Sequence, residues 1–274
     1  MSTSNKKTID PIRKQYEKWD DQLYKEYEKL FPESEYTNNW DGVIFPEMYA
    51  KSRFKVMILN REGYGEPFNH YFLHRTIRKQ IEADAWFLKY QKTLRLHLKQ
   101  YLTVLNCITI RPDGFKSLSD DIVRERVNAA GYYDLTKLLE GVAYCNVKKS
   151  DGLPRSNRMN LKEYAEKGLD IIKKQIAYFN PSIILAGDVC DGILNDLIDD
   201  SGWDENLYIG PERRICIYQI KIDGHNYPLV DMFHPSRIQG MSEYYLELLH
   251  ALQAVEKDNP LFWINRLDTP CFDM

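Results

Sequence analysis

The sequence predicts an α/β protein, a three-layer α/β/α sandwich with a short, mostly parallel, doubly wound central sheet. Short apolar stretches alternate with amphipathic stretches of helical length, as in sheets whose two faces are both covered by helices. The 274 residues are 43% hydrophobic and 28% charged, which is typical of a globular domain with a sizeable core. We therefore expect a helical N-terminal appendage over residues 1–45 and one α/β domain over residues 46–274.

The N-terminal part is expected to begin with a helix over residues 10–31. Asp10 can cap this helix and Pro11 suits its first turn, while apolar residues recur at spacings of three and four. A buried strand is expected over residues 54–59. It leads into Asn60–Gly65, where two glycines indicate a turn.

The remaining elements follow from periodicity and from turn signals. Asn180-Pro181 is expected to end a helix, Asp223-Gly224 is a hairpin-type turn, and residues 148–158 are expected to form a loop rich in cations. The expected order is helix 70–105, helix 119–140, strand 141–147, helix 161–179, strand 182–187, a helix from Asp188, strand 213–222, strand 226–233 and helix 242–256.

Composition narrows the classes of protein that fit. No apolar run is long enough to span a membrane, and the polar N-terminus predicts no secretory signal. The five scattered cysteines lack metal-ligand spacing, so we expect reduced thiols and a cytoplasmic protein. The net charge of −3 is unlike that of most DNA-binding domains, although a local basic patch would suffice.

Polar side chains follow three of the predicted strands. Glu62 follows the first strand, Asn146 lies within the second, and His234 follows the last. The carboxyl ends of parallel strands can converge on one crevice. A carboxylate there can steady an oxocarbenium-like sugar, an amide can read the edge of a base, and a histidine can hydrogen-bond a departing base. This set suits hydrolysis of an N-glycosidic bond.

In these motifs the chain resembles the uracil-DNA glycosylase superfamily. Asn60–Gly65 resembles the family's Gly-Gln-Asp-Pro-Tyr-His motif, and Tyr144–Lys148 resembles a strand with a base-reading asparagine, as in Thr-Asn-Val-Val-Lys. Asn180–Gly187 is similar to a Pro-x-Val-Ile-Val-x-Leu-Gly stretch, and His234–Ser236 matches the family's His-Pro-Ser motif. The resemblance spans about residues 53–256.

The resemblance implies a role for each matching residue. Glu62 takes the position of the catalytic aspartate, and His234 that of the histidine that stabilises the departing base. Asn146 would read the base, and Tyr64 would wall the pocket near the base's C5 position. An aromatic residue that stacks on the base is also implied shortly after the first motif, with three candidates: Phe68, Tyr71 and Phe72.

DNA contacts are expected on both sides of this site. The segment 237–241 would probe the minor groove, with Ile238 or Met241 as an apolar wedge that helps to drive a base from the stack. Cations after the second predicted strand could meet phosphates. The expected DNA-binding residues are Lys148, Lys149, Arg155, Arg158, Ser236, Arg237, Ile238 and Met241.

The first motif departs from the family pattern. Glu62 is longer than aspartate by one methylene, and Gly63 and Gly65 stand where the family has proline and histidine. These departures extend the expected substrates from uracil to other deaminated bases and to modified bases such as those of phage genomes. Thermophile-type members carry an iron–sulfur cluster on four cysteines, but Ser150 stands near one expected ligand, so we predict neither a cofactor nor a metal. His70 and His74 are four apart but lack a third ligand, which favours a structural role.

The sequence thus predicts a monofunctional DNA glycosylase that leaves an abasic site, in DNA repair or antiviral defence. No lysine is positioned for amine attack, so strand cleavage is not expected. Two alternatives stay open. One is a nucleic-acid-binding or sensing module of the same fold with an impaired site. The other is a hydrolase of free nucleosides or nucleotides, which would not need segment 237–241.

Overall fold

The computed structural model describes the chain in ten stretches. These are residues 10–32, 39–52, 55–64, 71–82, 139–152, 157–187, 189, 206–210, 215–233 and 241–258. Their elements are α1 (Pro11–Leu30), β1 (Asn39–Trp40), β2 (Gly42–Val43), α2 (Pro46–Lys51), β3 (Val56–Tyr64), β4 (Tyr71–Phe72), α3 (Leu73–Glu82), the 3-10 helix η2 (Leu139–Gly141), β5 (Val142–Gly152), α8 (Arg158–Phe179), β6 (Ile183–Gly187), β7 (Asn206–Ile209), β8 (Ile215–Ile222), β9 (His225–Met232) and α10 (Met241–Asp258).

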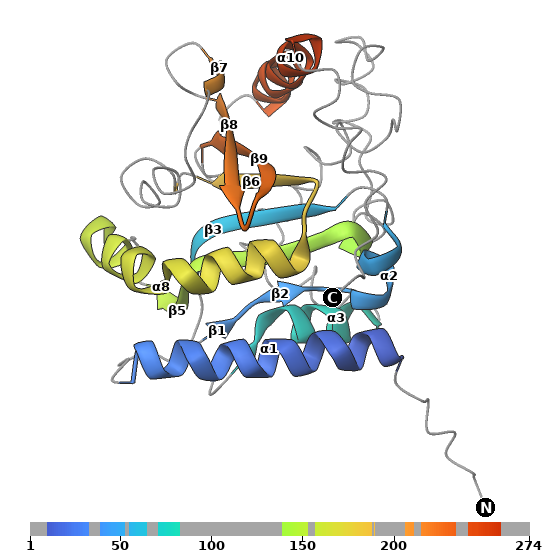
Figure 1. Cartoon of the computed structure of the whole chain (residues 1–274), viewed down its shortest axis with the longest axis vertical. Coiled ribbons are helices and arrows are strands. Elements are labelled where there is room, and N and C mark those ends of the chain that lie inside the picture. Colours follow the sequence, from blue (N-terminus) through green and yellow to red (C-terminus); the bar gives the residue numbers. More distant parts are fainter. Residues whose placement is uncertain are drawn as a thin grey trace, which may run out of the picture.

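A mixed sheet of seven described strands organises the molecule (Figure 1). Its order is β2-β5-β3-β6-β9-β8-β7. The central strands β5, β3, β6 and β9 are parallel to one another, whereas β2 at one end and β8 and β7 at the other are antiparallel to their neighbours. The short β1 and β4 form a separate parallel pair. The predicted α/β class with a parallel central sheet is therefore confirmed.

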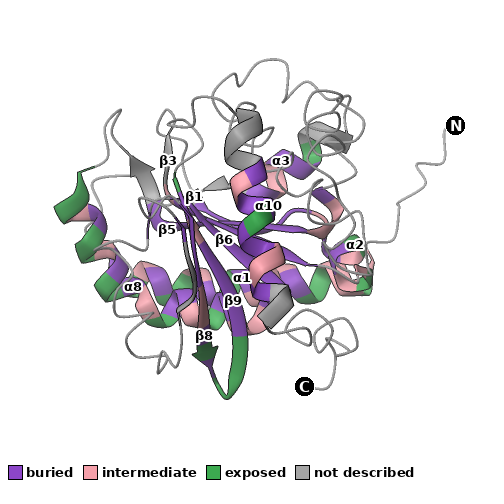
Figure 2. Ribbon diagram, turned by 90° about the horizontal axis from the view of Figure 1, so that it is seen from above, coloured by how far each residue is buried: buried purple, intermediate pink, exposed green. Residues whose placement is uncertain are grey.

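Helices lie on both sides of the sheet. Side chains of α1 and α8, such as Tyr16 and Ile172, pack with Met57, Leu59 and Cys145 of β3 and β5 in one buried cluster. Helix α10 lies on the opposite side and packs on β8 and β7 (Figures 1 and 2). The strands are mostly buried, and the exposed residues gather on the outer sides of the helices and at the β8–β9 turn (Figure 2). This is the predicted three-layer arrangement.

Local signals explain where the two longest helices begin and end. The Asp10 side chain accepts a hydrogen bond from the Ile12 N–H at 2.8 Å, as an N-cap does. The Asn157 side chain caps α8 in the same way. Asn180 ends α8 in the left-handed conformation, with φ 43°. The helices predicted over residues 10–31 and 161–179 are thus confirmed.

Several other predicted elements are also present. β6 and the β8–β9 hairpin agree with the predicted strands, and α10 agrees with the predicted last helix. Asp223 and Gly224 have φ values of 51° and 81°, as a two-residue type I′ turn requires. α3 covers part of the helix predicted over residues 70–105. The predicted helix is wrong at residues 71–72, which form β4 and pair with β1. Residues 83–105 of that helix, residues 119–138 of the next predicted helix, and the helix predicted from Asp188, apart from residue 189, lie outside the described residues.

Two predicted boundaries are wrong, because both strands are longer than expected. β3 continues through the predicted turn to Tyr64, and the pairing with β5 shifts register between Glu62 and Gly63. The extra residues, Lys149 and Ser150, are in β5, so the irregularity is a bulge of β5 opposite the step from Glu62 to Gly63. β5 continues to Gly152, so the first part of the predicted cationic loop is strand.

The N-terminal segment is part of the domain. β2 is the end strand of the main sheet and pairs with β5, and α1 packs against α8 and α2. Trp40 and Asp41 are fully buried. The boundary expected at residue 45 therefore does not separate two structural units among the described residues. None of the described helices is long and apolar enough to cross a membrane.

Candidate functional site at the carboxyl ends of the parallel strands

The register of the sheet brings the carboxyl ends of the four parallel strands to one edge. Asn60 of β3 pairs with Asn146 of β5, and both are level with the carboxyl ends of β6 and β9, where Gly187 pairs with Met232; β3 and β5 continue beyond this level. β3 lies between β5 and β6. After β3 the chain forms β5 on one side of it and then β6 on its other side. Ligands of doubly wound sheets bind at the carboxyl ends of the strands beside such a switch. The sheet therefore points to the ends of β3, β5 and β6.

Asn146 is the most unusual side chain at this edge. It is 1% exposed, and neither its amide nitrogen nor its amide oxygen has a hydrogen-bond partner in the part of the chain that the structure describes. Buried amides are normally hydrogen-bonded, because desolvating such a group without a partner is unfavourable. A buried amide with an unused donor and an unused acceptor is suited to a ligand that supplies both.

A second asparagine lies next to Asn146. Asn60 is 2% exposed and is the in-register neighbour of Asn146 on β3. It hydrogen-bonds with the hydroxyl of Tyr144. Burial raises the pKa of Tyr144, and the hydrogen bond with Asn60 lowers it by a smaller amount. Tyr144 therefore stays protonated at neutral pH and interacts with Asn60. Sequence reasoning did not select either residue, although Asn60 opens the motif that it examined.

The backbone positions of four other residues predicted around the base are described, and one of them, Tyr71, lies in β4 opposite Asn39 of β1. Glu62 lies two residues beyond Asn60 on β3, opposite Lys148 of β5, and Tyr64 ends β3. Phe72 is in β4, opposite Trp40 of β1. Glu62 thus lies at the same edge of the sheet as Asn146, whereas Phe72 belongs to the separate two-stranded pair.

Other predicted site residues fall outside the described part of the chain. β9 ends at Met232, two positions before His234 in the sequence, so the histidine follows a strand as predicted. Met241 is the first residue of α10 rather than part of a loop. Outside the described residues lie His234, Phe68, Arg155, Ser236, Arg237 and Ile238.

The predicted phosphate-binding cations are not in one surface loop. Lys149 is fully buried, and its Nζ is 2.6 Å from Asp41 Oδ1, so it is not available to a phosphate. Lys148 is 4% exposed; its Nζ donates to Asn160 Oδ1 at 3.0 Å and lies over the Tyr164 ring. The physical reason is that β5 continues through both residues, with Lys149 in the register shift after Lys148, and each ammonium group has a partner within the fold, Asn160 or Asp41. Among these cations, Arg158 is exposed, at the start of α8.

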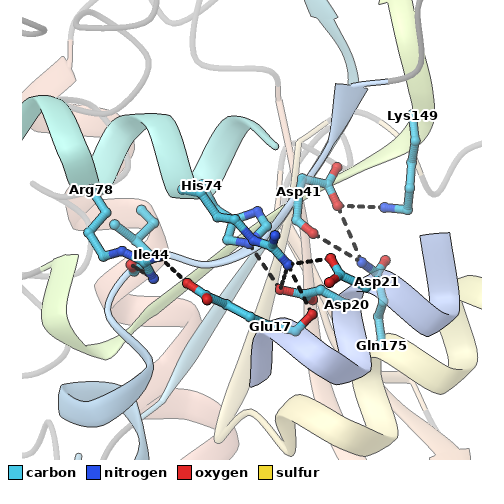
Figure 3. Close-up of polar contacts among 10 residues, drawn as sticks. Glu17, Asp20, Asp21, Asp41, Ile44, His74, Arg78, Lys149 and Gln175 are labelled. Atoms are coloured by element: carbon cyan, nitrogen blue, oxygen red, sulfur yellow. Dashed lines mark hydrogen bonds and ion pairs between the residues drawn. The ribbon is translucent and has the colours of Figure 1, made fainter. Parts of the chain in front are cut away.

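Asp41 is the centre of a buried polar network with Lys149 and Gln175 (Figure 3). Its carboxylate accepts hydrogen bonds from the Asn146 N–H at 2.6 Å, from Lys149 Nζ at 2.6 Å and from Gln175 Nε2 at 3.3 Å. Burial, with the nearby Asp41 charge, raises the pKa of the Cys145 thiol. Sequence reasoning missed Asp41, because Asn146 lies 105 residues away and no spacing relates the two.

A second buried polar cluster joins α1 to α3 (Figure 3). His74 Nε2 lies 3.0 Å from Asp20 Oδ2, and both side chains are at most 3% exposed. Arg78 donates to Glu17 Oε1 at 2.6 Å and to the Ile44 carbonyl at 3.3 Å. His74 thus takes part in packing α3 against α1, in line with the structural role expected for it. No group of three histidine, cysteine or acidic side chains among the described residues could hold a metal ion.

Comparison with known proteins gave no match. No protein-family model matches the chain, and neither the curated proteins nor the solved structures contain a significantly similar one. The functional conclusion must therefore come from the site itself.

Proposed function

We propose that this chain is a monofunctional DNA glycosylase. It hydrolyses the N-glycosidic bond of a flipped-out uracil, deaminated base or modified base and leaves an abasic site. The observation that carries the proposal is Asn146 of β5, level with the carboxyl ends of β6 and β9, whose buried amide has neither its donor nor its acceptor used by the described residues. The resemblance to uracil-DNA glycosylases in four short motifs supports the same reading.

The chemistry of a base fits the Asn146 amide. A uracil-like edge offers an N3–H donor beside a carbonyl acceptor, which complements the oxygen and nitrogen of one amide. Enzymes of this kind read an extruded base through hydrogen bonds to its Watson–Crick edge. A bound base would thus supply the two partners that Asn146 lacks among the described residues.

The reaction needs a leaving base and a water molecule at the sugar C1′. The base leaves with the electron pair of the glycosidic bond, and His234 hydrogen-bonds the resulting anion. The Glu62 carboxylate stabilises the oxocarbenium-like sugar and orients the water, whose oxygen bonds to C1′ while one of its protons passes to that carboxylate. The Nζ groups of Lys148 and Lys149 are engaged by Asn160 and Asp41, which agrees with hydrolysis rather than amine attack.

DNA binding is proposed to use the segments that follow the strands. Arg158 is exposed and can meet a phosphate, and segment 237–241 would probe the minor groove. Arg155 and Ser236 stay in the proposed set, and Phe68 and Phe72 remain candidates for stacking on the base. Lys149 is withdrawn from the DNA contacts, because its charge is already paired inside the protein.

The proposal is tested by measuring base release from oligonucleotides. The substrates carry uracil, hypoxanthine, 5-hydroxymethyluracil, 5-hydroxymethylcytosine or glucosylated 5-hydroxymethylcytosine, in single and double strands. We expect release of at least one base without strand cleavage. Glu62→Gln and His234→Ala should each lower the single-turnover rate by about 100-fold or more, since both act on charge that develops in the transition state.

A matched control and two contrary outcomes make the test sharp. Glu163→Gln changes an exposed glutamate of α8 that pairs with Lys167, and it should leave base release unchanged. Tight DNA binding without release of any base would favour the sensing module over the glycosylase. Turnover of free nucleosides that survives deletion of segment 237–241 would favour the nucleoside hydrolase.

A further inference from the structure

The edge of β5 changes its partner next to Asn146. β2 pairs with β5 at Val43↔Ala143 and at Gly42↔Tyr144, and there the strand ends. The next outward-directed backbone groups of β5 belong to Asn146, because alternate residues of a strand hydrogen-bond to the same neighbour. The residue before β2 is Asp41, so a side chain takes over where the strand stops.

An ion pair satisfies both backbone groups of Asn146 at this point. Its N–H donates to Asp41 Oδ2 at 2.6 Å, and its carbonyl accepts from Lys149 Nζ at 2.8 Å. The two side chains are joined by the 2.6 Å contact between Lys149 Nζ and Asp41 Oδ1. Asp41 and Lys149 thus hold the peptide groups of Asn146 as a short strand would.

The pair is itself fixed from several sides. Gln175 of α8 donates to Asp41 Oδ1 at 3.3 Å, and the Tyr27 hydroxyl accepts the Lys149 N–H at 3.0 Å. Lys149 Nζ also lies 5.1 Å from the centre of the Trp40 ring. Both charged side chains are at most 1% exposed, so neither can exchange its partner for water. The arrangement is rigid because α1, α8 and the β1–β2 segment all contribute to it.

We propose that the buried Asp41–Lys149 pair is a positioning device that holds Asn146 so that its amide can read the substrate base. This inference rests on the proposed glycosylase function, because it assigns the device to base reading. Asp41 and Lys149 touch no substrate and act only through Asn146. Reading a base by hydrogen bonds needs a fixed amide, since a displacement of about 1 Å at a reacting or reading group lowers rates by about 100-fold.

The test is a double-mutant cycle between Asp41 and Asn146. Asp41→Asn should lower the rate of base release by at least about tenfold. In an Asn146→Ala background the same change should cause no further loss, because the residue through which it acts is gone. Lys149→Met should behave like Asp41→Asn. Asp20→Asn is the matched control, because it also removes a buried carboxylate with a buried partner, and it should leave base release unchanged in both backgrounds.

Hydrogen exchange of the Asn146 backbone amide, followed by NMR on the same proteins, gives a readout that does not need activity. The Asn146 amide should be strongly protected from exchange in the parent protein, and its protection should fall by at least about tenfold in Asp41→Asn. The protection of the Leu59 amide should stay the same. The double variant Asp41→Asn, Lys149→Met leaves no uncompensated buried charge and carries the test if a single variant does not fold.

The outcomes separate the two proposals. Base release with a non-additive cycle and lost Asn146 protection supports the positioning role. Base release with additive effects, or with Asp41→Asn as active as the parent, overturns that role and leaves the glycosylase standing. Absence of any base release from the parent overturns the glycosylase and with it the reading role. In that case the exchange data still test whether the Asp41–Lys149 pair holds the backbone of Asn146. Protection that is retained in Asp41→Asn would show that it does not.

Discussion

At the scale of single residues, Asn146 is the costliest side chain of the candidate site. An amide desolvated without hydrogen bonds destabilises a fold by about 1–3 kcal/mol. Its neighbour Asn60 has the same chemistry and the same burial, yet hydrogen-bonds with Tyr144. The burial of Asn146 therefore destabilises the fold more than that of Asn60. Of the two, only Asn146 has both amide atoms without a hydrogen-bond partner among the described residues and so available to a ligand.

We predict that Asn146→Leu stabilises the protein while it abolishes base release. Leucine has the same branched shape with the same number of non-hydrogen side-chain atoms and needs no partner, so the free energy of unfolding should rise by about 1–3 kcal/mol. Urea unfolding measures this change, and the oligonucleotide assay measures the loss of activity. Asn60→Leu is the control, because it removes a used hydrogen bond and should not stabilise. A destabilised Asn146→Leu protein would show that the amide has a partner.

Some site residues could be predicted from the sequence and others could not. Asn146 was predicted because it lies in an apolar strand before a cationic segment, a local pattern. Asp41 was not, because its contacts to Asn146 and Gln175 span 105 and 134 residues. Lys149 looks like a surface cation in the sequence, and only the buried carboxylate of Asp41 explains why it turns inward.

At the scale of elements, turn chemistry was more informative than glycine alone. Asp223-Gly224 predicted its hairpin because both residues adopt positive φ there. Gly63 was read as a turn, but β3 passes through it with a shift of register. Isolated glycines therefore mark an irregularity in a strand as well as its end. The strand predicted over residues 141–147 was too short for a different reason. The polar residues after Asn146 resemble a loop in the sequence, and only their buried partners show that they belong to β5.

We predict that Gly224→Ala destabilises the β8–β9 hairpin. Its φ of 81° strains any residue with a Cβ, although no atom lies within 4 Å of the position that a Cβ would take. The free energy of unfolding should fall by about 1 kcal/mol, measured by urea unfolding. Base release below the unfolding range should stay as in the parent, because the turn is at the end of β9 remote from Met232. Unchanged stability would mean that the turn readily adopts another type.

At the scale of the whole molecule, buried and partly buried tyrosines connect its elements. Tyr27 of α1, Tyr144 of β5 and Tyr178 of α8 all have their pKa raised, mainly by burial, and that of Tyr178 reaches about 12. The Tyr27 hydroxyl also accepts the Lys149 N–H, so it links α1 to the strand that carries Asn146. The protonated, neutral forms of these side chains are the ones that the fold accommodates.

We predict that these tyrosines limit stability in alkali. The folded state keeps their protons at pH values where the unfolded chain releases them. Their contribution to stability is therefore complete below about pH 10 and is lost as the pH rises through their raised pKa values, which for Tyr178 is about 12. Urea unfolding from about pH 8 to about pH 11, with tyrosinate absorbance, measures the fall. Tyr178→Phe should make it less steep, and an unchanged slope would contradict the assignment.

Where β2 stops pairing with β5, side chains bind the backbone of β5 in its place. This feature also bears on how the protein avoids association with itself. The pairing of β2 with β5 ends at Gly42↔Tyr144, and unpaired N–H and carbonyl groups at a strand edge can recruit further strands. Asp41 and Lys149 occupy the N–H and the carbonyl that an incoming strand would need at Asn146. The contacts that order Asn146 thus close the sheet against aggregation at the point where its own edge strand stops.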